Sequence, residues 1–194
     1  MSVVSGTRVN LTPSGTFEES QPDWSPVSGD NRIAYISNRT GSTQVFTSLI
    51  TLSTTPTLTS RVQVTSDSQV NNLLITYRAP KWSPNGIRLG FSSNQRDGSD
   101  FDVFFSRYQN GTWNTPENLT SGRFTLDDEF VAWDPEHVQT NQDYRIAFTS
   151  RDENQTGTRE LYIRTRTSEG TGYTQTTVKP EWNNPAYGER HPDW

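Results

Sequence analysis

The chain has 194 residues, of which 29% are hydrophobic and 11% aromatic, and it carries a formal net charge of −5 at pH 7. This net negative charge, with no long basic run, argues against electrostatic binding to the phosphate backbone of nucleic acid. No stretch reaches the roughly 18 apolar residues of a membrane span, and the absence of cysteine excludes disulfides and thiolate metal sites. Few aliphatic but many aromatic side chains favour short strands over helices or disorder, in a single domain over 1–194.

A tryptophan phrase recurs along the chain and sets a period. Trp24, Trp82, Trp133 and Trp194 are separated by 82−24 = 58, 133−82 = 51 and 194−133 = 61 residues. The phrase Glu19–Trp24 returns as Glu189–Trp194, with four of its six residues the same. Self-similarity at such a period predicts a repeat architecture, in which each unit stacks on its neighbours.

Four clusters of strand character are expected in each period. The first ends at the tryptophan, and each later cluster shows period-two alternation between turn residues. The second clusters are Arg32–Ser37, Arg88–Ser93 and Arg145–Ser150; the third are Gln44–Ser48, Asp102–Ser106 and Glu160–Arg164; the fourth are Arg61–Thr65, Glu117–Thr120 and Thr174–Val178. The repeats therefore cover approximately 22–79, 80–130 and 131–191, with an outer-strand segment at 8–12 and a terminal inner-strand segment at 191–194.

Four short strands in about 50 residues is the size of one propeller blade. The repeated residues spell Trp-Ser-Pro, a turn, Arg-Ile-Ala-Phe-x-Ser, a polar turn, and a Val-Phe or Leu-Tyr strand. This order resembles the TolB-type (WD-repeat-like) β-propeller repeat family, and the segment from Trp82 to Phe104 matches it best. Trp133-Asp134-Pro135 and the Thr/Ser-rich insertion Thr51–Ser60 depart from it.

The resemblance implies an all-β fold of four-stranded antiparallel blades around a channel, usually six or more to a ring. Three blades form a partial, or half, propeller and leave apolar sheet faces uncovered, which marks an interaction surface. We therefore expect a protein partner or further copies of the chain, as a homo-oligomer or a fragment of a longer chain. Paired half-rings and head-to-tail assembly both remain open.

Several residues are candidates for a site. The repeated tryptophans Trp24, Trp82, Trp133 and Trp194 are expected to pack between blades as scaffold. Asp97, Asp100 and Asp102 could hold calcium, against the alternative of a solvated Asp-Gly turn. Aromatic side chains outside the repeated positions suit contacts with a partner or a sugar ring, against the alternative that they cover blade ends; these are Trp113, Tyr173, Trp182 and Tyr187.

Catalytic motifs are absent from the sequence, which has no Gly-x-Ser-x-Gly elbow, no cysteine nucleophile and no phosphate-binding glycine loop. The interpretation is a non-enzymatic module for protein binding or self-assembly, without a cofactor unless calcium binds, and periplasmic or extracellular by analogy with the family. Two alternatives stay open: a carbohydrate-binding or carbohydrate-active propeller, and the gating propeller of a prolyl-oligopeptidase-like peptidase.

Overall fold

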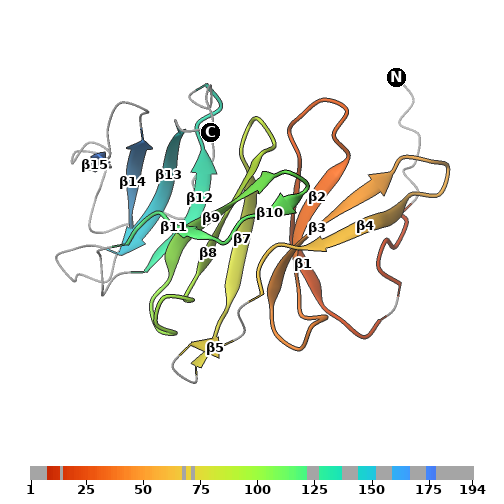
Figure 1. The fold of residues 1–194 in the computed structure, drawn as a ribbon, viewed down its shortest axis with the longest axis horizontal. Coiled ribbons are helices and arrows are strands. Elements are labelled where there is room, and N and C mark those ends of the chain that lie inside the picture. Colours follow the sequence, from red (N-terminus) through yellow and green to blue (C-terminus); the bar gives the residue numbers. More distant parts are fainter. Residues whose placement is uncertain are drawn as a thin grey trace.

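The computed structural model describes residues 8–13, 15–66, 69–70, 73–121, 127–136, 144–151, 159–166 and 174–177. Over these residues the chain is all-β, with antiparallel sheets and no helix, which confirms the predicted class. A membrane-spanning helix is accordingly not found in the described part. Figure 1 shows three main sheets that lie side by side in chain order.

The first and third main sheets are meanders in which neighbours in sequence are neighbours in the sheet, and the second follows the same order from β7 to β9. The first sheet consists of β1 (Glu19–Trp24), β2 (Arg32–Ser37), β3 (Gln44–Thr51) and β4 (Thr57–Gln63). The second consists of β7 (Tyr77–Trp82), β8 (Arg88–Ser93), β9 (Asp102–Gln109), β10 (Thr112–Trp113) and β11 (Glu117–Asn118), both of the last two pairing with β9. The third consists of β12 (Asp128–Trp133), β13 (Tyr144–Arg151), β14 (Arg159–Arg166) and β15 (Thr174–Thr177), and β5 (Gln69–Val70) with β6 (Leu73–Leu74) forms a small separate hairpin.

Two parts of the predicted strand pattern need correction. The outer strand expected at 8–12 is wrong, because no residue of that segment is in a strand. There the amide of Thr12 donates to the side chain of Asn10 at 2.9 Å, a local turn that competes with pairing at a sheet edge. The insertion Thr51–Ser60 instead extends the hairpin of β3 and β4, so that β4 begins at Thr57, earlier than expected.

An identical irregularity marks the inner strand of all three sheets. Gln21, Ala79 and Phe130 have φ angles of 52°, 47° and 58°, a region that L-residues rarely adopt. In each strand the register against its neighbour shifts around this residue, as in a β-bulge. The bulge occurs three residues before the repeated tryptophan each time, so the sequence repeat is also a repeat of backbone geometry.

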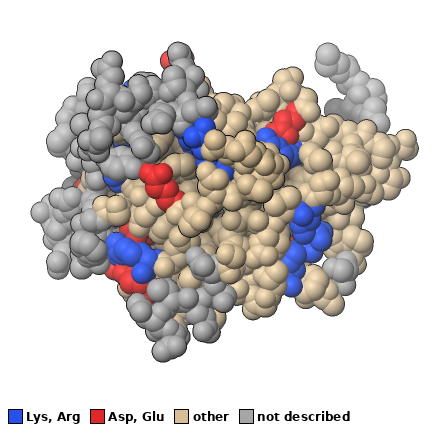
Figure 2. All heavy atoms as spheres, in the orientation of Figure 1, with Lys and Arg blue, Asp and Glu red and all other residues tan. Residues whose placement is uncertain are grey.

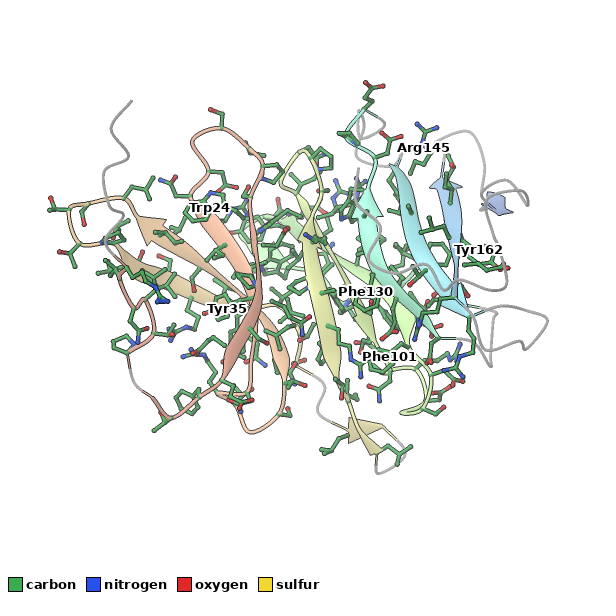
Figure 3. The ribbon with its side chains drawn as sticks, turned by 180° about the vertical axis from the view of Figure 1, so that it is seen from behind. Trp24, Tyr35, Phe101, Phe130, Arg145 and Tyr162 are labelled. Carbon is green, nitrogen blue, oxygen red and sulfur yellow. The ribbon has the colours of Figure 1, made fainter. Side chains whose placement is uncertain are left out.

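The core lies between the sheets. Alternation along each strand turns one set of side chains toward the preceding sheet and the other toward the following sheet. The first junction buries Ala34, Ile36, Val45 and Val64 against Ile75, Tyr77, Trp82, Leu89, Phe91 and Phe104. The second buries Val103, Phe105 and Leu119 against Val131, Trp133, Tyr144, Ile146, Phe148 and Tyr162. Figure 3 shows the side chains as sticks on the ribbon and labels Tyr162 of the third sheet, which belongs to the second junction.

Gly90 in β8 shows how closely the second and third sheets approach. A Cβ atom at this position would lie 2.8 Å from Cγ1 of Val131 and 3.2 Å from the indole of Trp133. Gly90 pairs with Lys81, the residue before Trp82. The residues that pair at the same position in the first and third sheets are Ala34 and Ala147. Small residues therefore stand where the next sheet presses on the strand.

We expect Gly90→Val to lower the free energy of unfolding by about 1–3 kcal/mol, because the added methyl groups overpack the second junction. Valine favours strands over glycine, so intrinsic propensity alone predicts the opposite sign. Urea denaturation measures the change, with Thr59→Val on exposed β4 as the control. Unchanged or increased stability of Gly90→Val would contradict the close approach.

Candidate functional site

The three inner-strand tryptophans have equivalent positions but different surroundings. Trp24 pairs with Ile33, as Trp82 pairs with Leu89 and Trp133 with Ile146. Trp82 and Trp133 are each 5% exposed, whereas Trp24 is 48% exposed. Trp82 and Trp133 each pack on the sheet that precedes their own. Within the described residues, no sheet precedes the one that carries Trp24.

Contacts at Trp133 show what the preceding sheet contributes. Its indole N–H donates to the backbone carbonyl of Lys81 at 3.0 Å, and its ring lies edge-on to Phe105 with centroids 6.4 Å apart. At the first junction, the backbone N–H of Trp82 donates to the carboxylate of Asp23 at 2.8 Å. The inner strands are thus joined from sheet to sheet by polar contacts as well as by apolar packing.

A stacked aromatic pair accompanies each tryptophan on the same face. Phe91 with Phe104 and Phe148 with Tyr162 have centroids 6.3 and 5.8 Å apart, and both pairs belong to the junction with the preceding sheet. In the first sheet the equivalent pair is Tyr35 with Phe46, 6.0 Å apart. We call the face that carries Trp24, Ile33, Tyr35 and Phe46 the free face of the first sheet.

The irregular segment that contains Leu11, Thr12 and Phe17 covers part of the free face, together with two arginine side chains. The guanidinium of Arg39 lies 5.5 Å from the ring of Phe46 and 5.4 Å from that of Phe17. Arg61 donates to the hydroxyl of Tyr35 at 3.0 Å. These contacts leave Tyr35 and Phe46 only 4% and 3% exposed, although no strand lies over them in the described structure.

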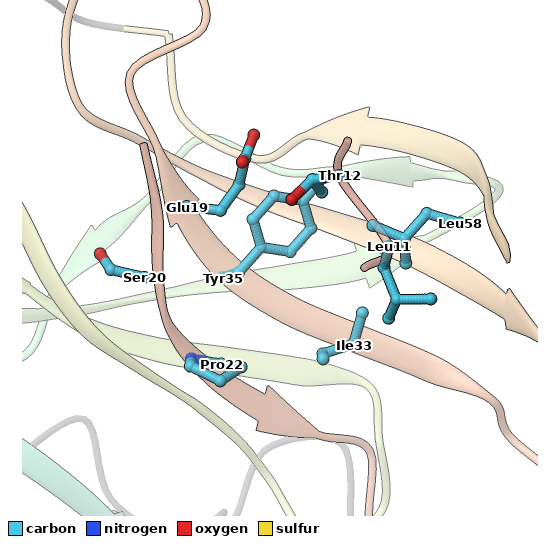
Figure 4. Close-up of a pocket in the computed structure, with 8 residues that line it drawn as sticks. All are labelled: Leu11, Thr12, Glu19, Ser20, Pro22, Ile33, Tyr35 and Leu58. Atoms are coloured by element: carbon cyan, nitrogen blue, oxygen red, sulfur yellow. The ribbon is translucent and has the colours of Figure 1, made fainter. Parts of the chain in front are cut away.

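Beneath that segment remains a cavity of about 140 Å³. Figure 4 shows Leu11 pointing toward Ile33 and Leu58, with Thr12 beside the ring of Tyr35. The remaining lining residues are Glu19, Ser20 and Pro22. The cavity is almost wholly apolar, so the segment leaves part of the free face unfilled.

A second cavity, of about 230 Å³, lies where the inner strands end and brings the repeated phrases together. Its lining residues are Asp23, Trp24, Pro26, Lys81, Trp82, Pro84, Ala132, Trp133 and Pro135. The ammonium group of Lys81 is 3.0 Å from the carboxylate of Asp23. Trp24 therefore lies both on the free face and at the margin of this groove. Figure 2 shows acidic and basic side chains in small scattered groups on the face it presents, not in a patch of one sign.

The predicted binding residues divide between the described and undescribed parts. Tyr173, Trp182, Tyr187 and the scaffold Trp194 lie outside the described residues. Trp113 in β10 is half-buried, with its ring 5.6 Å from Trp82 and 5.2 Å from Tyr108. It therefore packs at the edge of the first junction.

The acidic residues proposed for calcium gather around Arg96. Its guanidinium lies 3.0, 3.7 and 3.2 Å from the carboxylates of Asp97, Asp100 and Asp102. Asp102 is fully buried and also accepts a hydrogen bond from Asn118 at 2.8 Å. Among the residues with a described structure, no group of three or more acidic, histidine or cysteine side chains is arranged to hold a metal ion.

These carboxyl groups differ in pKa because their surroundings differ. Partial burial acts to raise the pKa of Asp97, but hydrogen bonds from the backbone and hydroxyl of Ser99 and from Arg96 outweigh it and lower the value to about 2. Burial raises the pKa of Asp100, and the charges of Asp97 and Asp127 add to the effect. Burial also raises the pKa of Asp102 against the opposing hydrogen bond of Asn118.

We expect Asp97→Asn to lower the free energy of unfolding at neutral pH and to lose this effect in acid. The pKa of Asp97 is lowered from 3.8 to about 2 in the folded state. Its contribution to the free energy of unfolding is therefore present above pH 3.8 and is lost as the pH falls toward 2. Asp100→Asn is the matched control with opposite sign, since its raised pKa makes the ionised form unfavourable. Denaturant unfolding at a series of pH values measures both, and a pH-independent Asp97→Asn effect would contradict this assignment.

Comparison with known proteins supports the fold. No protein-family model and no curated protein matches the chain. A solved structure that it resembles is that of a protein from Agrobacterium tumefaciens assigned as TolB, with 16% sequence identity and a TM-score of 0.52. The match covers 81% of this chain and 48% of that chain, so this chain spans about half the length of that protein. At this identity the likeness is one of fold, and the chain has an all-β fold similar to a TolB β-propeller.

Proposed function

We propose that the three main sheets, of four, five and four strands, are blades of a partial β-propeller, and that the chain is a non-enzymatic module for protein binding or self-assembly. Three features support the blade assignment. Each main sheet is antiparallel, each inner strand has the same bulge, and the sheets resemble part of a TolB propeller. By the same family analogy, we place the protein in the periplasm or outside the cell.

The observation that carries the proposal is the exposure of Trp24. Its two equivalents are 5% exposed because a preceding sheet covers them, while Trp24 is 48% exposed. Covering the remaining indole surface of roughly 100 Å² would contribute about 2–3 kcal/mol. A half-exposed tryptophan at the margin of a groove is typical of the anchor residue of a protein interface.

Binding is favoured over catalysis by the chemistry of both cavities. Their linings are mainly apolar, aromatic and proline side chains. The charged members are held in ion pairs, Glu19 with Arg39 and Asp23 with Lys81. Side chains that neutralise each other in this way suit orientation of a partner better than proton transfer or nucleophilic attack.

Light scattering over a concentration series tests the proposal. We expect wild-type protein to associate into particles heavier than 22.0 kDa. Trp24→Ser should raise the dissociation constant at least about tenfold, because losing roughly 2 kcal/mol of apolar burial exceeds the 1.4 kcal/mol of a tenfold change.

Leu52→Ser is the matched control, since Leu52 is 66% exposed in the turn between β3 and β4 and lines neither cavity. It should leave association unchanged. A wild-type protein that stays at 22.0 kDa at all concentrations, or a Trp24→Ser variant that associates equally well, would overturn the proposal.

A further inference from the structure

We infer that Asn110 is a site of spontaneous covalent modification, at which the side-chain amide is hydrolysed through a cyclic imide. The inference goes beyond the proposed function and does not depend on it. Asparagine or aspartate precedes glycine at three places in the sequence, Asn85-Gly86, Asp97-Gly98 and Asn110-Gly111. The three sites share the glycine neighbour but differ in their hydrogen bonds, so we expect them to react at different rates.

The reaction requires only water and the chain itself. The backbone nitrogen of Gly111 attacks Cγ of Asn110, the bond from Cγ to the side-chain nitrogen breaks, and ammonia leaves with the amide proton of the glycine. Water then opens the cyclic imide at either carbonyl, which gives an aspartate or an isoaspartate. The net change is the gain of water and the loss of ammonia, and nothing is oxidised or reduced. Glycine favours the attack because no side chain shields its amide.

Asn110 and Gly111 are the two central residues of the hairpin that joins β9 to β10. Their φ angles are 53° and 82°, and Gln109 pairs with Thr112, which defines a two-residue turn of type I′. Both central residues are exposed, and a Cβ on Gly111 would meet no atom within 4 Å. Among the residues that the structure describes, none forms a hydrogen bond with the Asn110 side chain or with the Gly111 amide. Both reacting groups are therefore unhindered.

One local rotation separates this turn from the reactive geometry. The nitrogen of Gly111 approaches Cγ of Asn110 when the peptide plane between the two residues turns over, from type I′ toward type II′. Type II′ is also a common two-residue hairpin turn, and it requires a positive φ only at the first central residue, where Asn110 already has one. Glycine adopts either sign of φ at the second position. The rotation therefore leaves the pairing of β9 with β10 intact.

Asn85-Gly86 lies in the turn between β7 and β8, and its side chain and its glycine amide are both held. The side-chain oxygen of Asn85 accepts from the hydroxyl of Ser83 at 2.8 Å and from the amide of Ile87 at 3.3 Å. The amide of Gly86 donates to the carbonyl of Ser83 at 2.8 Å, and the carbonyl of Gly86 accepts from Arg32 at 2.9 Å. Attack at Asn85 requires these bonds to break first, which raises its barrier.

Asp97-Gly98 is held in a similar way. Oδ1 of Asp97 accepts from the amide and from the hydroxyl of Ser99, each at 2.9 Å. The amide of Gly98 donates to the carbonyl of Asn94 at 2.8 Å. A carboxylate is also a poorer target for a nucleophile than an amide, so this site is less reactive for two reasons. Asn110 is the remaining site.

Modification of Asn110 changes both the charge and the backbone of the hairpin. A neutral side chain becomes a carboxylate, and in the isoaspartate form the main chain runs through the former side chain, which lengthens the turn by one carbon. Trp113 follows this turn, pairs with Tyr108, and has its ring 5.6 Å from that of Trp82. A longer turn shifts this pairing, so the modified chain loses packing at the edge of the first junction.

Incubation of the purified full chain at mildly alkaline pH, followed by peptide mapping with mass spectrometry, tests the inference. Alkaline pH promotes removal of the glycine amide proton. We expect the mass gain of deamidation to appear at Asn110 at least about tenfold faster than at Asn85, because attack at Asn85 must first break several hydrogen bonds. In urea, where both turns are unfolded, the two rates should become similar, since both asparagines precede glycine.

Two variants isolate the site. Asn110→Gly removes the reacting amide and keeps the positive φ of the turn. It should abolish most of the mass gain and the fall in the urea midpoint that accompanies it. Asn85→Gly is the matched control and should leave the time course of both changes as in the wild type.

Equal or faster modification at Asn85 in the folded chain would overturn the inference. So would a mass gain that persists in Asn110→Gly, or a modification of Asn110 that occurs only in urea. Modification of Asn110 at an unchanged urea midpoint would support the assignment of the site and contradict the loss of packing around Trp113.

Discussion

Packing of one small sheet on the next is the interaction on which this structure depends. A sheet of four short strands offers two faces and has too few side chains to bury either by itself. The two internal junctions resolve this with the same elements each time: an indole, a stacked aromatic pair and small or aliphatic residues opposite them. The first sheet has the same indole and aromatic pair, but among the described residues no sheet precedes it, so its indole stays half-exposed.

Polar groups give each junction its register. The carboxylate of Asp23 bonds the amide of Trp82, and the side chain of Gln21 accepts from the amide of Ala79 at 2.5 Å. At the second junction, the hydroxyl of Ser92 accepts from the amide of Phe130, and the carbonyl of Lys81 accepts from the indole of Trp133. Apolar packing alone tolerates sliding, whereas paired donors and acceptors do not, so the bulges and their partners hold the sheets at one setting.

Short-range patterns in the sequence were enough to predict the second and third strands of each main sheet. Alternation and turn residues predicted β2 and β8 with the bounds that the structure shows. Contacts between residues that are far apart in the sequence could not be predicted from these patterns. Arg8–Thr12 has strand character but is irregular, with a local turn at Asn10 and with Leu11 and Thr12 at the cavity beside Tyr35 and Ile33. The pairing of Arg96 with three carboxylates likewise depends on how the loop folds back, which residue spacing does not specify.

The serial arrangement of the sheets has a consequence for how stability grows. Three sheets in a row have two junctions, and each further sheet adds one more junction while one outer face at each end stays uncovered. A closed circle has as many junctions as sheets, so the closing step adds a junction without ordering any additional residues. The closing junction is therefore formed at a lower cost in backbone entropy than any other junction of the series. An arc of such sheets is therefore driven toward closure by its own geometry.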